Sequence, residues 1–103
     1  MKYLITESQL DNIIFRYLDN QDFIQIKDGN RIYFANSEGD EFAQIRYGKS
    51  YGWCIIYYKL VKEISSFFSI DKYDSEQVIG RWVENTLQMN VTETGVAADI
   101  SIF

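Results

Sequence analysis

Histidine, the side chain most often used for acid–base chemistry near neutral pH, is absent from all 103 residues. Its absence removes the commonest general base, the commonest metal ligand and every nucleophile that depends on a Ser–His or Cys–His pair. The single cysteine, Cys54, lies inside the apolar run Trp-Cys-Ile-Ile-Tyr-Tyr, which favours a small buried hydrophobe over a reactive thiol. One cysteine cannot form a disulfide within the chain, and we expect a reducing environment.

Carboxylates gather in one predicted turn, at Glu38, Asp40 and Glu41. Counted from Asn36, they alternate like the ligands of a calcium loop, but the glycine comes at the fourth position instead of the sixth, and the twelfth residue is tyrosine, not glutamate. No pair of acids has a spacing that marks it for glycoside hydrolysis, and no glycine-rich phosphate loop is present. We therefore expect no catalytic residue, no metal site and no cofactor, and we interpret the turn as a charged surface patch.

Aromatic and basic residues are interleaved at Arg46, Tyr47, Lys49, Tyr51 and Trp53. This composition is typical of platforms on which single-stranded nucleic acid stacks. The net charge of −5 argues against that function, because phosphate contacts need clustered Lys and Arg. We favour a different interpretation, in which every second residue from Tyr51 to Tyr57 shares one strand face and packs on the helices.

Hydrophobic spacing predicts the elements that would position these residues. An apolar stripe at helical spacing indicates a helix over 7–19, with Thr6 and Gln9 as a capping box. Four short β-type runs follow, over 23–27, 31–35, 41–47 and 51–56, and the turns between them indicate an antiparallel meander.

Two further helical stripes follow the meander, over 57–68 and from Asp74 onward, with Asp74 and Gln77 as a second capping pair. Gly80 interrupts the second stripe at a cost of about 1 kcal/mol relative to alanine, so we expect a close approach of another backbone there. Thr94-Gly95 is predicted as a turn before a final strand or hairpin. The prediction is a single α+β domain over 1–103: an N-terminal helix, a four-strand antiparallel meander, two helices and a C-terminal strand or hairpin.

The opening run Ile-Thr-Glu-Ser-Gln-Leu at 5–10 resembles the start of many small proteins of large-genome tailed bacteriophages. The later stretch FFSIDKYDSEQVIGRWVENTL is similar to segments of such proteins. The resemblance implies no catalytic residues. Ile5-Thr6-Glu7 also matches the kind of tripeptide after which phage prohead proteases cut. The opening is therefore a helix cap, a partner-docking address or a cleaved leader, and we expect the cap.

Together these features predict a non-enzymatic protein–protein interaction module, as a structural or accessory component of a phage virion. The alternative is an acidic inhibitor of a host defence or transcription protein. We expect protein partners, either virion proteins or a second copy of the chain, and neither direct nucleic-acid binding nor a membrane, since no apolar run approaches the roughly 18 residues of a membrane span. The expected location is the virion or the host cytoplasm. The expected interface residues are Tyr51, Trp53 and Tyr58 as apolar anchors and Glu38, Asp40 and Glu41 as the charged patch.

Overall fold

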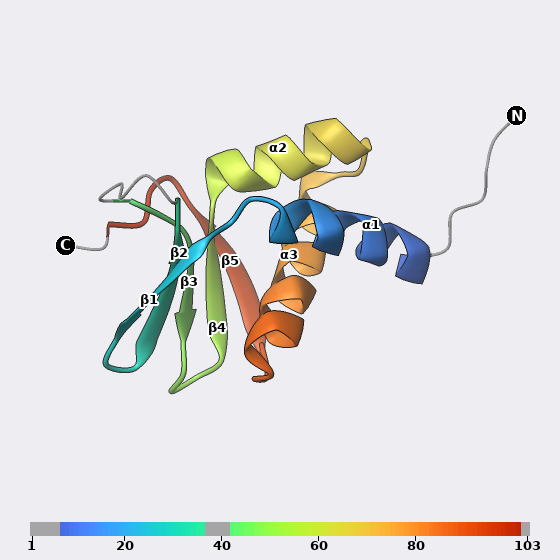
Figure 1. Cartoon of the computed structure of the whole chain (residues 1–103). Helices are drawn as coiled ribbons and strands as arrows, with labels where there is room; N and C mark the ends of the chain where they lie inside the picture. Colours follow the sequence, from blue (N-terminus) through green and yellow to red (C-terminus); the bar gives the residue numbers. More distant parts are fainter. Residues whose placement is uncertain (1–6, 37–41, 102–103) are drawn as a thin grey trace, which may run out of the picture.

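Three helices pack on one face of a five-stranded sheet with strand order β1-β2-β3-β4-β5 (Figure 1). The computed structural model describes residues 7–36 and 42–101. The α+β prediction is confirmed at this level. The elements are α1 Glu7–Asp19, β1 Ile24–Asp28, β2 Arg31–Ala35, β3 Ala43–Gly48, β4 Trp53–Tyr57, α2 Tyr58–Phe68, α3 Lys72–Leu87 and β5 Glu93–Ala97.

The first helix and the meander follow the predicted pattern. Helix α1 has the predicted bounds, and β1 to β4 pair antiparallel in sequence order through two tight hairpins and one longer connection. The proposed cap residue Thr6 lies outside the described residues, as do Glu38, Asp40 and Glu41. The sequence-based expectations for these four side chains therefore stay predictions.

The fifth strand departs from the prediction. Strand β5 pairs parallel to β4, and α2 and α3 together form the crossover that a parallel pair requires. Thr94 and Gly95, predicted as a turn, lie inside β5 opposite Cys54 and Ile55. The glycine has a packing role there, because a Cβ at position 95 would lie 3.2 Å from the Cδ1 of Ile55.

Helix α3 begins earlier than the prediction placed it. Its N-cap is Asp71, whose side chain accepts a hydrogen bond of 2.7 Å from the backbone N–H of Asp74. Asp74 therefore lies in the first turn, where its charge suits the positive end of the helix, and the predicted cap at Asp74 is wrong. Both residues are polar capping types, and the spacing alone did not decide between them.

The main core lies between the helices and the sheet. Trp82 of α3 packs its indole 5.2 Å from the ring of Phe34 in β2, and its Nε1–H donates to Asp19 at the end of α1 over 2.9 Å. Arg81 donates two hydrogen bonds, of 2.7 and 2.9 Å, to the Asp11 carboxylate. These contacts fix α1 against α3 above the sheet.

Among the residues that the structure describes, those that cover the second face of the sheet, which points away from the helices, lie at one end of it. A register shift between β2 and β3 at Phe34/Ala35 is a β-bulge that places Ala43 on this face. The chain after β5 returns to this side (Figure 1), and Ile100 packs there on Tyr33 and Ala43 while its carbonyl accepts from the Ala43 N–H over 2.8 Å. The opposite end, next to the two hairpin turns, stays exposed.

Candidate functional site

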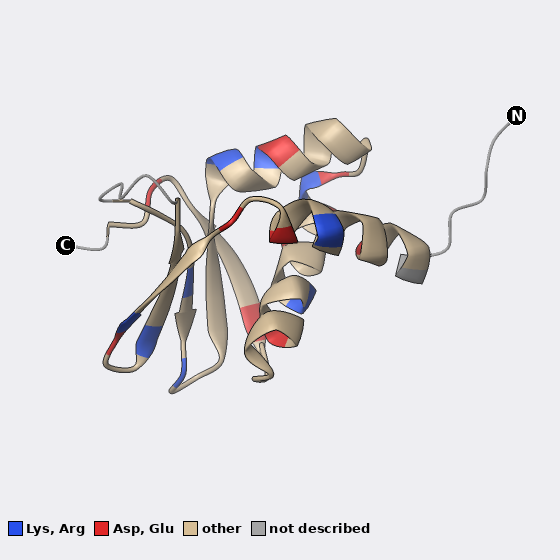
Figure 2. Cartoon of the chain, in the orientation of Figure 1, with Lys and Arg blue, Asp and Glu red and all other residues tan. Residues whose placement is uncertain are grey.

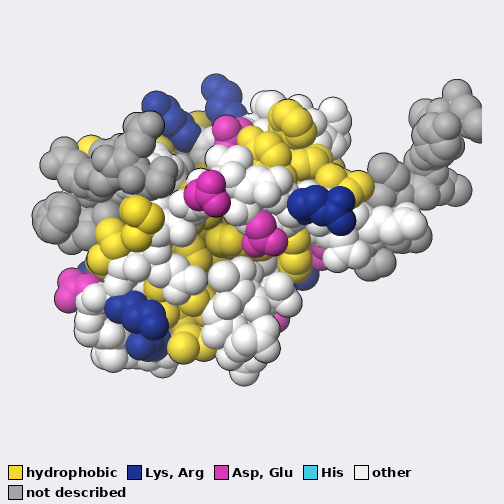
Figure 3. Space-filling model, viewed as in Figure 1, with side chains coloured by type: hydrophobic (Ala, Val, Ile, Leu, Met, Phe, Trp, Pro, Cys, Tyr) yellow, Lys and Arg dark blue, Asp and Glu magenta, His cyan; other side chains and the backbone are white. Residues whose placement is uncertain are grey.

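A hollow of about 470 Å³ opens at the exposed end of the second sheet face. Its walls come from the ends of β2, β3 and β4 and from the two hairpin turns. Figure 3 shows basic side chains at the surface over the lower end of the strands, where the hairpin turns lie in Figure 1. We call it the hairpin-end hollow; its lining residues are Asn30, Arg31, Arg46, Gly48, Ser50, Tyr51, Trp53 and Ile55.

Two aromatic side chains form one wall of the hollow. Tyr51 is 71% exposed and Trp53 is 50% exposed, and their ring centroids lie 5.3 Å apart with the planes tilted by 34°. The structure therefore brings together two of the predicted anchors. The prediction that their strand face packs on the helices is wrong, because the alternate residues Cys54 and Ile56 take that place in the core.

Two arginines face the same hollow from neighbouring strands. Arg31 pairs with Gly48 across β2 and β3, and Arg46 lies between Tyr33 and Ile55 in the next row. Residues that pair directly across strands point to the same face, so the two guanidinium groups lie on the same side of the sheet as Trp53. Gly48 has no side chain between Arg31 and Trp53, which leaves the floor of the hollow open.

Backbone hydrogen bonds hold the two hairpin turns in place. The Lys49 N–H donates to the Asn30 carbonyl over 2.7 Å, which joins the turns to each other. The Thr92 N–H donates to the Gly52 carbonyl over 2.8 Å. This bond joins the β3–β4 turn to the residue that directly precedes β5. Gly52 has a φ of +68°, and a Cβ there would lie 2.9 Å from the Asn90 carbonyl oxygen. Only glycine permits this close packing, which positions Tyr51 and Trp53 on either side of it.

The remaining residues of the predicted aromatic–basic run lie elsewhere. Tyr47 points to the helix side, where it is buried and its hydroxyl donates to the Asn90 carbonyl over 2.7 Å. Burial, with smaller contributions from Cys54 and Glu84, raises the pKa of Tyr47. Lys49 is an exposed turn residue beside the hollow. Arg46, Tyr51 and Trp53 are therefore the part of the run that shares one site.

Tyr58, the third predicted anchor, is separate from this site. It is the first residue of α2, and its hydroxyl accepts a hydrogen bond of 3.2 Å from the Lys72 ammonium. That bond and the nearby charge of Lys72 lower the pKa of Tyr58. Arg31, in contrast, was not predicted. Side chains alternate between the two faces of a strand, so Arg31 and Tyr33 must share one face of β2. The sequence did not indicate which of the two faces is exposed.

Cys54 is not a candidate nucleophile in this fold. Its thiol is fully buried beneath α3, which confirms the prediction of a small core hydrophobe. Burial, followed by the charge of Glu76, raises the pKa of the thiol to about 12. The nucleophilic thiolate is therefore scarce near neutral pH.

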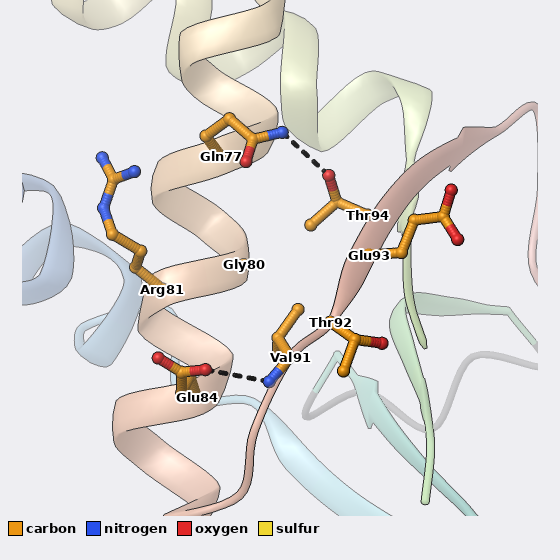
Figure 4. A pocket seen from close by; sticks show the side chains of 8 residues that line it. All are labelled: Gln77, Gly80, Arg81, Glu84, Val91, Thr92, Glu93 and Thr94. Carbon is orange, nitrogen blue, oxygen red and sulfur yellow. Dashed lines mark hydrogen bonds between the residues drawn. The ribbon is translucent and has the colours of Figure 1, made fainter. Parts of the chain in front are cut away.

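A second, smaller pocket of about 100 Å³ lies between α3 and β5 (Figure 4). Several of its polar groups are hydrogen-bonded within the contact: Gln77 donates to the Thr94 hydroxyl over 3.0 Å, and that hydroxyl donates to the neighbouring Glu76 over 2.7 Å. The Val91 N–H donates to the Glu84 carboxylate over 2.9 Å. Because these groups are already paired, the pocket is a structural contact between helix and strand.

Within 7–36 and 42–101, no three His, Cys, Asp or Glu side chains lie where they would hold a metal ion. No helix in these ranges has the length and apolar character needed to cross a membrane.

The hairpin-end hollow is suited to binding, since it combines a flat apolar wall with two cationic forks that donate hydrogen bonds in a plane. Its volume falls within the range of about 300–1,000 Å³ that ligand sites occupy. Its described lining residues include no Asp, Glu, His, Cys or Lys side chain. Neither a protein-family model, nor a curated protein sequence, nor a solved structure matches this chain.

Proposed function

We propose that this protein is a non-enzymatic module that binds a partner protein through the hairpin-end hollow. One observation carries the proposal: Tyr51 and Trp53 are exposed side by side, with Arg31 and Arg46 on the same sheet face. Trp, Tyr and Arg are the residue types that dominate the binding energy of protein interfaces. Arg31, Arg46 and Trp53 lie on strands of the sheet, and Tyr51 lies in the β3–β4 turn that the Thr92–Gly52 hydrogen bond holds in place. Little conformational entropy is therefore lost when a partner binds.

The setting we propose is a phage virion, with the protein as a structural or accessory component. The support for this setting is the resemblance of 5–10 and of the stretch from Phe67 to Leu87 to proteins of tailed bacteriophages. The alternative was an inhibitor that uses its acidity against a basic host protein. The exposed anchors favour the first reading, because they lie among arginines and would not attract a basic surface.

The proposal predicts that Tyr51 lies against the partner in the cell. Replacing Tyr51 with the photo-crosslinker p-benzoylphenylalanine in phage-infected cells should give one specific adduct on irradiation. Tyr73 of α3, which is 67% exposed on the helix side, is the matched control position, and the same replacement there should give no such adduct.

Mass spectrometry of the adduct identifies the class of partner. A virion protein supports the proposed setting, and a host defence or transcription protein supports the inhibitor. Equal adducts from positions 51 and 73, or adducts from position 73 alone, would show that the hollow is not the interface.

A further inference from the structure

We propose that the hairpin-end hollow recognises an acidic segment of its partner, in which a carboxylate lies beside an aromatic or large apolar side chain. The carboxylate binds the guanidinium groups of Arg31 and Arg46, and the apolar side chain packs on Tyr51 and Trp53. This inference rests on the proposed function and gives the chemistry of the partner.

The two arginines are available to an incoming anion. Among the described residues, neither guanidinium takes part in a salt bridge, although Asp28 lies directly across β1 and β2 from Arg31. Arg31 and Arg46 are diagonal neighbours on adjacent strands, since Arg31 pairs with Gly48 and Arg46 with Tyr33. A guanidinium group donates two parallel hydrogen bonds to the two oxygens of a carboxylate. Two neighbouring guanidinium groups therefore form a defined binding site for one carboxylate.

The rings of Tyr51 and Trp53 provide the apolar part of the binding site. The rings of Tyr51 and Trp53 are tilted by 34° with centroids 5.3 Å apart, and Ile55 continues the apolar surface toward the middle of the sheet. Aromatic rings prefer offset or edge-to-face contacts at centroid separations of about 4.5–7 Å. A Phe, Tyr, Trp or Leu side chain of the partner would therefore fit on this wall next to the arginines.

The charge of this part of the molecule complements an acidic partner. The two hairpin ends, 27–31 and 46–53, contain four basic side chains against the single acid Asp28, a net charge of +3 in a chain of net charge −5. The acids Glu38, Asp40 and Glu41 belong to the separate connection between β2 and β3. Figure 2 shows basic residues at the hairpin end of the strands, while most acidic ones lie on the helices and at the start of β5. The four basic residues are Lys27, Arg31, Arg46 and Lys49.

The flanking acids favour a single carboxylate over a nucleic-acid strand. The row across the sheet at this level runs Asp28, Arg31, Gly48, Trp53, Glu93, with an acid on each outer strand. A phosphate chain that continued across the sheet in either direction would meet Asp28 or Glu93 and be repelled. A peptide presents one carboxylate to the arginines and continues with neutral residues, so it avoids both acids.

A random heptapeptide display library selected on the whole protein tests the inference. Peptides selected on the unchanged protein should be enriched in Asp or Glu next to an aromatic or large apolar residue. The double variant Arg31→Gln/Arg46→Gln should lose the acidic enrichment. The matched control Lys59→Gln/Lys62→Gln, which removes the same charge from the exposed side of α2, should keep it.

Nuclear magnetic resonance of the two indole N–H groups then locates the binding. A selected peptide should shift the Trp53 signal and leave that of the buried Trp82 unchanged, and replacing its acid with the amide should weaken binding at least about tenfold, because a hydrogen-bonded charge contributes about 1.5–3 kcal/mol. A selection without acids, or equal binding of the amide peptide, overturns the inference.

Failure of the inference can be separated from failure of the proposed function. If Tyr51 crosslinks to a partner protein but the selected peptides carry no acid, the interface stands and the proposed chemistry is wrong. If a thymidine oligonucleotide shifts the Trp53 signal and the peptides do not, the hollow binds nucleic acid and the inference is overturned. If no crosslink forms at position 51, the proposed function itself fails.

Discussion

Replacing Trp82 with alanine is expected to lower the free energy of unfolding by about 3–5 kcal/mol, the usual cost of truncating a large buried aromatic residue. The Trp82 side chain is 3% exposed and contacts the rings of Phe23 and Phe34. Its loss leaves a cavity at the junction of α1, α3 and β2, and it leaves Asp19 without its hydrogen-bond donor. Urea denaturation followed by far-ultraviolet circular dichroism measures the change.

The second tryptophan is the matched control for this experiment. Trp53 is half exposed on the second sheet face, where its ring contacts Tyr51. Trp53→Ala should cost no more than about 1 kcal/mol, since only the aromatic pair and part of the ring area are lost. Trp82→Phe, which keeps much of the core volume, should fall between the two. An equal loss from both alanine variants would contradict the assignment of one tryptophan to the core and the other to the surface.

Adding a single methyl group at Gly80 is expected to destabilise the protein by about 1–3 kcal/mol, despite the better helix propensity of alanine. A Cβ at position 80 would lie 2.7 Å from the Cγ2 of Thr94 in β5. The neighbour is a branched side chain held by hydrogen bonds to Gln77 and Glu76, so it cannot rotate away without breaking them.

A double-mutant cycle identifies this contact as the cause. Serine at position 94 keeps the hydroxyl and its hydrogen bonds but has no Cγ2. Gly80→Ala should therefore be much less costly in a Thr94→Ser background, and the coupling free energy should fall in the range of about 0.5–3 kcal/mol for residues in contact. Strictly additive effects in denaturant titrations would show that Gly80 is required for another reason.

The contact at Gly80 illustrates what the sequence could predict. A glycine inside a strongly periodic helix indicated close packing, and the structure places β5 there, with a side chain and not a backbone as the nearest group. A final strand was predicted, but not its bounds or its parallel pairing, because Thr94-Gly95 has the composition of a turn. Its pairing with β4 depends on the long crossover through two helices, which local patterns do not encode.

The two faces of β4 show most clearly what the sequence pattern could not predict. Residues 53–57 are all apolar or aromatic, so a period-two pattern cannot tell which set faces the core. Packing decides it: the compact Cys54 and Ile56 fit beneath α2 and α3, while Trp53 faces outward. The helices were easier to predict, because their apolar stripes at a spacing of three and four residues are bounded by polar ones.

The most direct test of the proposed binding site uses the partner protein that is crosslinked at position 51. Its affinity is measured for the unchanged protein and for two alanine variants. Trp53→Ala should weaken binding by about 30-fold or more, because hot-spot residues contribute about 2 kcal/mol or more and each 1.4 kcal/mol is a factor of ten. Tyr73→Ala, which removes another exposed aromatic residue, on the helix side, should leave the affinity unchanged. Equal affinity of the Trp53→Ala variant and the unchanged protein would contradict the central claim that the hairpin-end hollow is the binding site.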